Sequence, residues 1–335
     1  AHSRTMTRFS MLVALLLPLL PAGALGFEVV YSENVGRYPY DDLVLGSDGS
    51  FYGTTYQGGT SGNGTVFKVT ASGTLTTLVS FNGTDGRYPE AGLVEGSDGA
   101  FYGTTSRGGA SDHGTVFKIT TAGVHHVLHS FNTPSGRYPQ ARLILGSDGN
   151  FYGTTYQGGA SGSNGTVFRI TTAGVHSVLH NFNNNNGRYP WAGLVEGSDG
   201  VFYGTTYEGG ASGYGTVFKI TSEGVHSVLY NFDGASGIRP RARLLEGSDG
   251  AFYGTTYQGG ASGEGTAFKI TTEGVYSVLH HFSGTAGRYP YGGLTEGNDG
   301  TLYGTTRQGG SNDYGTVFKI TTGGAHSVLH NFNNN

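Results

Sequence analysis

Six arginines at matching positions are the first candidates for chemistry in this sequence. Five belong to the tetrapeptide GRYP, and one belongs to the variant GIRP at residues 237–240. A guanidinium group binds a carboxylate or sulfate through two parallel hydrogen bonds, so a ring of arginines could capture an anionic ligand. The alternative is structural: a recurring arginine can tie loops together through carbonyl oxygens or through recurring glutamates such as Glu95 and Glu196. The six are Arg37, Arg87, Arg137, Arg188, Arg239 and Arg288.

The residue that follows each GRYP varies although its surroundings repeat. It reads Tyr40, Glu90, Gln140, Trp191, Arg241 and Tyr291. A glycine-rich loop later in each repeat also varies, with tyrosine at 214 and 314. Aromatic and planar polar side chains stack on sugar rings and hydrogen-bond to them. The alternative is that these are exposed positions that drift between duplicated repeats. The candidate ligand-binding residues are Arg37, Tyr40, Arg87, Arg137, Arg188, Trp191, Tyr214, Arg241, Arg288, Tyr291 and Tyr314.

Two further sets of polar residues favour structural roles. The aspartates of the recurring SDG turns lie a repeat apart, whereas calcium needs six to eight oxygens at one point. The histidine pair His125 and His129 has a spacing that places both on one strand face, about 13 Å apart, too far to share a metal. No repeat departs from the pattern with additional acidic residues or histidines. We therefore expect no catalytic residues, no metal site and no cofactor.

The repeat itself predicts the architecture. The word YGTT recurs six times in steps of 50 or 51 residues, which indicates a solenoid, a propeller or a domain array. The second repeat reads as four strands at 91–96, 101–105, 114–120 and 124–131, with the residue before Pro139 extended. We predict an all-β fold, a closed six-bladed β-propeller of four-stranded antiparallel blades, as one domain over residues 27–335. The repeats start near residues 36, 86, 136, 187, 237 and 287.

The amino-terminal segment has the layout of a secretory signal. Arg4 and Arg8 precede an apolar run at 11–20, and small residues follow, so we expect residues 1–26 to be a signal peptide. The alternative, a membrane anchor, needs about twice that apolar length. Residues 27–32 align with the fourth strand of each repeat, and we expect them to add a closing strand to the last blade. Their alternative partner is an exposed strand edge of another molecule.

Composition excludes several classes of function. The chain has no cysteine, so it has neither disulfides nor thiolate chemistry. Its formal net charge of −4 supplies no basic surface for nucleic acid. We expect a secreted or cell-surface protein with no membrane span in the mature chain.

The motifs resemble a known family. SDGxFYGTTYQGG followed by GTVFKIT and VLHNF is similar to the Gloeo/Verruco (GloVer) tandem repeat over about residues 27–335. The resemblance implies an exported bacterial repeat protein and supplies no catalytic residues.

These observations lead to a functional hypothesis. We expect an exported, non-catalytic binding or scaffold module, with its ligand face on the rim formed by the GRYP segments and the glycine-rich loops. The expected partner is a glycan or cell-surface polymer, with self-association through residues 27–32. The alternatives are an extracellular polysaccharide-active hydrolase or lyase, and a self-assembling surface protein that uses the spare strand.

Overall fold

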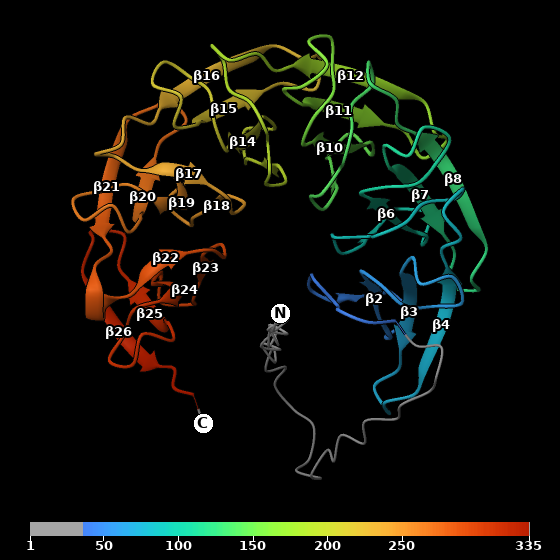
Figure 1. Cartoon of the computed structure of the whole chain (residues 1–335), viewed down its shortest axis with the longest axis horizontal. Helices are drawn as coiled ribbons and strands as arrows, with labels where there is room; N and C mark the ends of the chain where they lie inside the picture. The colour runs from blue at the N-terminus through green and yellow to red at the C-terminus, as the bar shows by residue number, and fades with distance from the viewer. Residues whose placement is uncertain (1–35, 335) are drawn as a thin grey trace, which may run out of the picture.

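The computed structural model describes residues 36–334 as six small sheets arranged around a central axis (Figure 1). Each sheet is one blade, and its four antiparallel strands lie side by side in chain order. Each of the last two blades contains one additional short strand. The first strand of each blade lies nearest the axis and the fourth lies outermost. The all-β, six-bladed propeller predicted from the repeats is confirmed.

The blades have nearly identical bounds. The first three consist of β1 (Val44–Leu45), β2 (Phe51–Thr55), β3 (Thr65–Val69), β4 (Leu75–Ser80); β5 (Val94–Glu95), β6 (Phe101–Thr105), β7 (Thr115–Ile119), β8 (His125–Ser130); and β9 (Ile144–Leu145), β10 (Phe151–Thr155), β11 (Thr166–Ile170), β12 (His176–Asn181). The last three consist of β13 (Val195–Glu196), β14 (Phe202–Thr206), β15 (Thr216–Ile220), β16 (His226–Asn231); β17 (Ile238–Pro240), β18 (Leu245–Glu246), β19 (Phe252–Gln258), β20 (Thr266–Ile270), β21 (Tyr276–His281); and, after the 3₁₀ turn η1 (Gly284–Ala286), β22 (Arg288–Pro290), β23 (Thr295–Glu296), β24 (Leu302–Gln308), β25 (Thr316–Ile320), β26 (His326–Asn331).

Neighbouring blades are joined by a repeated apolar junction. Each blade has a trailing face, made in the first blade by Tyr52, Val66, Val79 and Phe81, and a leading face, made in the second blade by Leu93, Phe101, Phe117 and Ile119. The trailing face of one blade packs on the leading face of the next, and both faces of the inner strands are therefore apolar. At each of the first four junctions a tyrosine ring stacks on a phenylalanine ring with centroids 3.9–4.0 Å apart.

The SDG turns anchor these tyrosines. The Tyr52 hydroxyl donates to Asp48 at 2.8 Å, and the Lys68 ammonium donates to the same carboxylate oxygen at 2.7 Å. The hydrogen bond from Lys68, followed by those from Ser50 and Tyr52, lowers the pKa of Asp48 to about 2. The aspartate is thus committed to the junction, as expected for a structural turn residue.

A β-bulge in the fourth strand changes the expected placement of the histidines. His129 pairs with Val116 while Val127 pairs with Phe117, so one additional residue is inserted between them. The insertion reverses the alternation of side chains, and the expectation that His125 and His129 share a strand face is wrong. His125 packs edge-on to Phe81 of the preceding blade, and His129 lies against the following blade.

The outer strands are linked by stacked imidazole pairs. The rings of His129 and His176 lie 3.9 Å apart and 4° from parallel. The same stack recurs between His180 and His226 at 3.8 Å and between His280 and His326 at 3.9 Å. At the junction of the fourth and fifth blades two tyrosines, Tyr230 and Tyr276, replace the histidines at 3.9 Å.

Over residues 36–334 the ring is not closed. Five buried clusters join consecutive blades, and none joins the sixth blade to the first. Figure 1 shows the first and last blades on either side of an opening. Residues 36–334 therefore do not form the expected contact that would close the ring between the sixth and the first blade. The expected signal peptide (1–26) and closing strand (27–32) lie outside the described residues. No helix within 36–334 is long and apolar enough to span a membrane.

We expect junction residues to stabilise the fold more strongly inside the ring than at its open end. Phe182 is 1% exposed at the junction of the third and fourth blades, whereas its counterpart Phe332 in the last blade is only half-buried. Phe182→Ala should lower the free energy of unfolding by about 3–5 kcal/mol, and Phe332→Ala by less than half as much. Urea unfolding of the two variants measures this difference. Equal losses would contradict an uncovered last blade.

We expect acid to destabilise the protein through the histidine stacks. Burial, with a smaller contribution from the facing imidazole, lowers the pKa of His176 and of His226 to about 3, whereas an unfolded histidine titrates near 6.5. Because the unfolded chain binds more protons in this range, stability should fall as the pH drops below about 6.5. The double variant His180→Tyr/His226→Tyr copies the Tyr230–Tyr276 pair. Its unfolding free energy should change less between pH 7.5 and pH 5 than that of the wild type. An equal change in both proteins would contradict acid destabilisation through this histidine stack.

Candidate active site

The GRYP segment and the glycine-rich loop of each repeat are paired through their backbones. The Arg87 amide donates to the Arg107 carbonyl at 2.8 Å, and the Arg107 amide donates to the Arg87 carbonyl at 3.1 Å. On the other side, the Tyr88 amide donates to the Asn63 carbonyl of the preceding blade at 2.8 Å. The two variable segments therefore lie together on one rim, as the strand order predicts.

The tyrosine of GRYP adopts an unusual backbone conformation. Tyr138 has a φ of 60°, in the left-handed region, so the expectation of an extended residue before Pro139 is wrong. Its amide donates to His113 at 2.9 Å and its carbonyl accepts from Tyr156 at 3.0 Å. These two backbone hydrogen bonds, one to each of two blades, offset the strain of this conformation and fix the position of Tyr138 on the rim.

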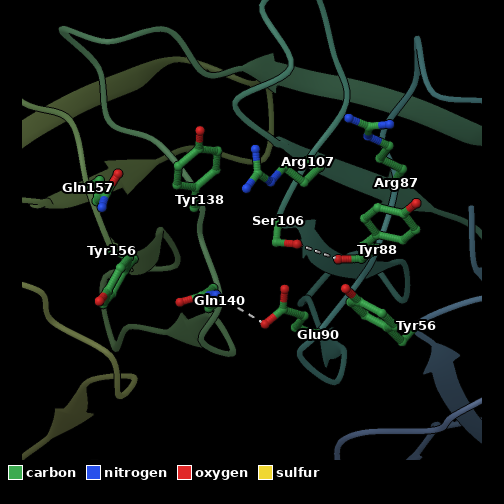
Figure 2. Close-up of a pocket in the computed structure, with 10 residues that line it drawn as sticks. All are labelled: Tyr56, Arg87, Tyr88, Glu90, Ser106, Arg107, Tyr138, Gln140, Tyr156 and Gln157. Carbon is green, nitrogen blue, oxygen red and sulfur yellow. Dashed lines mark hydrogen bonds between the residues drawn. The ribbon is translucent and has the colours of Figure 1, made fainter. Parts of the chain in front are cut away.

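A cavity of about 650 Å³ opens on this rim over the second and third blades (Figure 2). Four tyrosines and six polar or charged residues surround it. It is lined by Tyr56, Arg87, Tyr88, Glu90, Ser106, Arg107, Tyr138, Gln140, Tyr156 and Gln157. A concave site in which polar groups converge between aromatic rings can hold a small molecule.

Glu90 provides the only carboxyl group in the lining of this cavity. Its Oε2 accepts a hydrogen bond from Gln140 Nε2 at 3.2 Å (Figure 2). Burial raises the pKa of Glu90, while the nearby side chains of Ser106 and Gln140 and the charge of Arg107 partly oppose that rise. A carboxyl group with a raised pKa in a cavity is suited to general acid–base catalysis.

Arg107 supplies a positive charge beside this carboxyl group. Its guanidinium lies over the Tyr138 ring at 4.1 Å, and no carboxylate among residues 36–334 forms an ion pair with it. Its neighbour Arg87, in contrast, is paired with Asp112 at 2.6 Å. Arg107 is thus available to bind an anion or a negative charge that develops during a reaction.

Tyrosine rings form the walls on both sides of the polar groups. Tyr56 from the first blade stacks on Tyr88 at 4.9 Å. On the far side, Tyr156 contacts Trp191 edge-on at 5.2 Å, so the single tryptophan supports the wall from outside the cavity. Such rings present flat apolar surfaces to a sugar-sized ligand.

Three of the predicted ligand residues meet in a neighbouring cluster instead of the cavity. The Arg241 guanidinium lies 5.4 Å from the Trp191 ring and 5.1 Å from the Tyr291 ring. It also lies 5.0 Å from Tyr207 and 4.4 Å from Tyr257. These aromatic faces are occupied by a side chain of the protein itself through cation–π contacts.

Most arginines of the GRYP column hold loops together. Arg137 donates to the Gly162 carbonyl at 2.6 Å, Arg188 pairs with Glu208 at 2.7 Å, and Arg288 pairs with Asp313. This agrees with the structural alternative, and Arg137 has the expected carbonyl partner, but the carboxylate partners are not the recurring glutamates Glu95 and Glu196. Glutamates such as Glu95 instead accept hydrogen bonds from the preceding blade, as from the Ser47 hydroxyl at 2.6 Å.

The remaining predicted residues are dispersed along the rim. Arg37 pairs its backbone with Gln57, and Tyr40 is 54% exposed beside Tyr56. Tyr214 lies with Arg188 in a second cavity of about 380 Å³, and Tyr314 is exposed on the last blade. Of the predicted set, only Arg87 lines the larger cavity.

The cavity could have been found by comparing the repeats position by position, because two of its residues differ from their counterparts in every other repeat. Ser106 stands where four other repeats have tyrosine, and Arg107 stands where the others have glutamine or glutamate. In space these two residues lie with Glu90, from the variable position after GRYP, in the lining of one cavity. Neither Ser106 nor Arg107 is an acidic residue or a histidine, the residue types on which the expectation of no catalytic residues depended.

Comparisons with known proteins agree with the repeat architecture. The sequence matches the model of the Gloeobacter/Verrucomicrobia repeat over residues 19–190 and 142–335. A search of curated proteins gives no match.

Several solved structures share the fold. A Bacteroides uniformis protein named as a 6-phosphogluconolactonase has a TM-score of 0.56 at 15% identity, over 87% of this chain and 84% of that one. The periplasmic gluconolactonase of Pseudomonas aeruginosa has a TM-score of 0.53 at 17% identity, over 88% and 81%. The extracellular domain of a B. thetaiotaomicron protein named as a one component system has a TM-score of 0.57 at 10% identity, over 89% of this chain. The match spans about a third of that protein, 34% of its chain.

The expectation of a non-enzymatic binding or scaffold module is contradicted. Similar structures include two named as lactonases, and in the second repeat Glu90, Ser106 and Arg107 line one cavity. At these identities the likeness establishes the fold.

We expect Glu90→Gln to stabilise the protein above the range in which an ordinary glutamate titrates. A group whose folded-state pKa is raised costs no stability while it is protonated in both states, and it destabilises the fold as the pH rises through that pKa. The variant should therefore melt at a higher temperature than the wild type at pH 8 and at the same temperature at pH 4. Gln140 occupies the same position in the next repeat, so the fold tolerates the amide. An equal change in melting temperature at pH 8 and pH 4 would contradict a raised pKa of Glu90.

Proposed function

Since the chain belongs to the Gloeobacter/Verrucomicrobia repeat family, whose repeats here build a propeller, we propose that it is an exported hydrolase that opens an ester bond in a sugar derivative of the lactone type. One observation carries the proposal: Glu90 lines one cavity together with Ser106 and Arg107, two positions at which the second repeat differs from every other repeat. The lactonase names among similar structures support the same reaction class.

The polar groups supply the parts that ester hydrolysis needs. Glu90 in its ionised form takes a proton from a water molecule, whose oxygen attacks the carbonyl carbon of the lactone. Arg107 stabilises the oxyanion of the tetrahedral intermediate, since its charge has no carboxylate partner among residues 36–334. The intermediate then releases the ring oxygen, which takes the proton back from Glu90, and the product is a hydroxy acid. No second carboxyl group is required.

The cavity walls fit a sugar-derived ring. Tyr56 with Tyr88 on one side and Tyr156 on the other offer aromatic surface, while Gln140 and Gln157 offer amides to hydroxyl groups. Gln140 also holds Glu90 in place at 3.2 Å, which limits the positions from which the carboxylate can activate water.

We also propose that the enzyme acts outside the cytoplasm. The signal-like segment at residues 1–26 and the extracellular and periplasmic sources of two similar structures support this location.

We expect Glu90→Gln to lower kcat/KM for glucono-lactone hydrolysis by about 10²–10⁴-fold, because the amide cannot accept the proton from water. Arg107→Gln should lower kcat by about 10²–10³-fold through loss of oxyanion stabilisation. Both changes install residues that other repeats carry, Gln140 and Gln157, so they should not disturb the blade. A pH-stat assay with gluconolactone and with its 6-phosphate, corrected for spontaneous hydrolysis, measures the rates.

The matched control is Glu95→Gln. It makes the same chemical change five residues away, where the carboxylate bonds to Ser47 and does not line the cavity. This variant should keep the wild-type rate. No catalysed hydrolysis by the wild type, or an equal loss in both glutamate variants, would overturn the proposal.

A further inference from the structure

The last blade presents a trailing face with nothing packed on it among the described residues. In the first five blades the tyrosine of this face is fully buried, whereas Tyr303 is only half-buried. Thr305 is exposed, although its five counterparts are at most 4% exposed. Val317 is also half-buried and Leu329 is 50% exposed. The uncovered surface is therefore the same one that every other blade hides.

The first blade presents the complementary leading face. Phe51 and Phe67 are half-buried, whereas the phenylalanines of the next four leading faces are at most 1% exposed. Leu45 on the same side is 53% exposed. Its counterpart in the third blade, Leu145, packs into the junction with the second blade, which shows how a leucine at this position is covered.

We propose that these two end faces bind each other between copies of the chain, so that the last blade of one molecule docks on the first blade of a second. The five internal junctions show which surface fits a trailing face: a leading face. This chain carries one uncovered example of each within residues 36–334, and the second copy supplies the missing partner.

The docked junction reproduces contacts that the chain already makes. Tyr303 of one copy stacks on Phe51 of the other, as Tyr52 stacks on Phe101 at 3.9 Å. Thr305 donates to the carbonyl of Asp41, since Thr54 donates to the matching carbonyl of Ala91 at 2.9 Å. One exposed hydroxyl gains a protein partner as two exposed apolar surfaces are removed from water.

The contact joins two different surfaces, so a single contact leaves one face of each kind free. Such a heterologous contact closes into a ring or continues as an open assembly. The cavity on the second and third blades lies on neither end face, and the assembly is therefore independent of the proposed activity.

Analytical ultracentrifugation of the full chain over a range of concentrations tests the proposal. The wild type should associate into closed rings or longer assemblies as its concentration rises. Val317→Glu blocks the trailing face and Phe51→Glu blocks the leading face, so each variant alone should be monomeric. An equimolar mixture should form a 1:1 dimer and nothing larger, because one free face of each kind remains. Val275→Glu, at a side chain 67% exposed, is the control and should assemble like the wild type.

The mixture separates this junction from other causes of association. An apolar leader that aggregates would act equally in all variants, and docking of like faces would leave one variant associated with itself. A monomeric wild type at all concentrations, self-association of both blocked variants, or no dimer in the mixture would each overturn the proposal. Circular dichroism of each variant verifies that the blades are intact.

Discussion

The contact on which the propeller depends is the packing of a tyrosine ring from one blade on the next blade, against a phenylalanine ring at four junctions and beside Leu302 at the fifth. The stack requires space: a Cβ on Gly96 would lie 2.7 Å from the Tyr102 ring and 3.2 Å from the Phe151 ring, so this position needs glycine. It also requires a fixed tyrosine, which Asp98 provides by accepting from its hydroxyl at 2.8 Å. The SDG turn, the glycine before it and the YGTT strand are therefore parts of one junction, which explains why they recur together.

Because the junctions fix the blades, the rim residues are released from packing. The residue after GRYP is tyrosine in the first blade, glutamate in the second and tryptophan in the fourth, without a change in the surrounding strands. A single repeat can therefore carry polar groups on the rim while the junctions between blades stay unchanged. Glu90 illustrates the limit of this freedom, since burial among tyrosines raises its pKa and so disfavours its charged form.

The sequence could predict whatever every repeat shares. The alternation of apolar and polar side chains predicts the strands, and the Asp-Gly pair predicts the turn. Both signals act within a few residues, and the resulting strand order predicts the common rim. The bulge that separates His125 from His129 could not be predicted, because it depends on the register between two strands. The φ of Tyr138 depends on bonds to two blades. The cavity could not be predicted from the shared pattern for another reason: Glu90 and Arg107 are 17 residues apart, and Arg107 is informative only as a departure from the glutamine or glutamate of the other repeats.

The ends of the ring differ from the internal junctions in one polar contact. Four internal junctions carry a serine that bonds to a glutamate of the next blade, as Ser147 does to Glu196 at 2.6 Å. At the ends the corresponding residues are Asn298 and Leu45, so the bridge has no counterpart there. The second and third blades are joined without it, with Leu145 in the apolar cluster. A junction of this fold is thus complete without the ion-dipole bridge, and the apolar stack alone decides which surfaces fit.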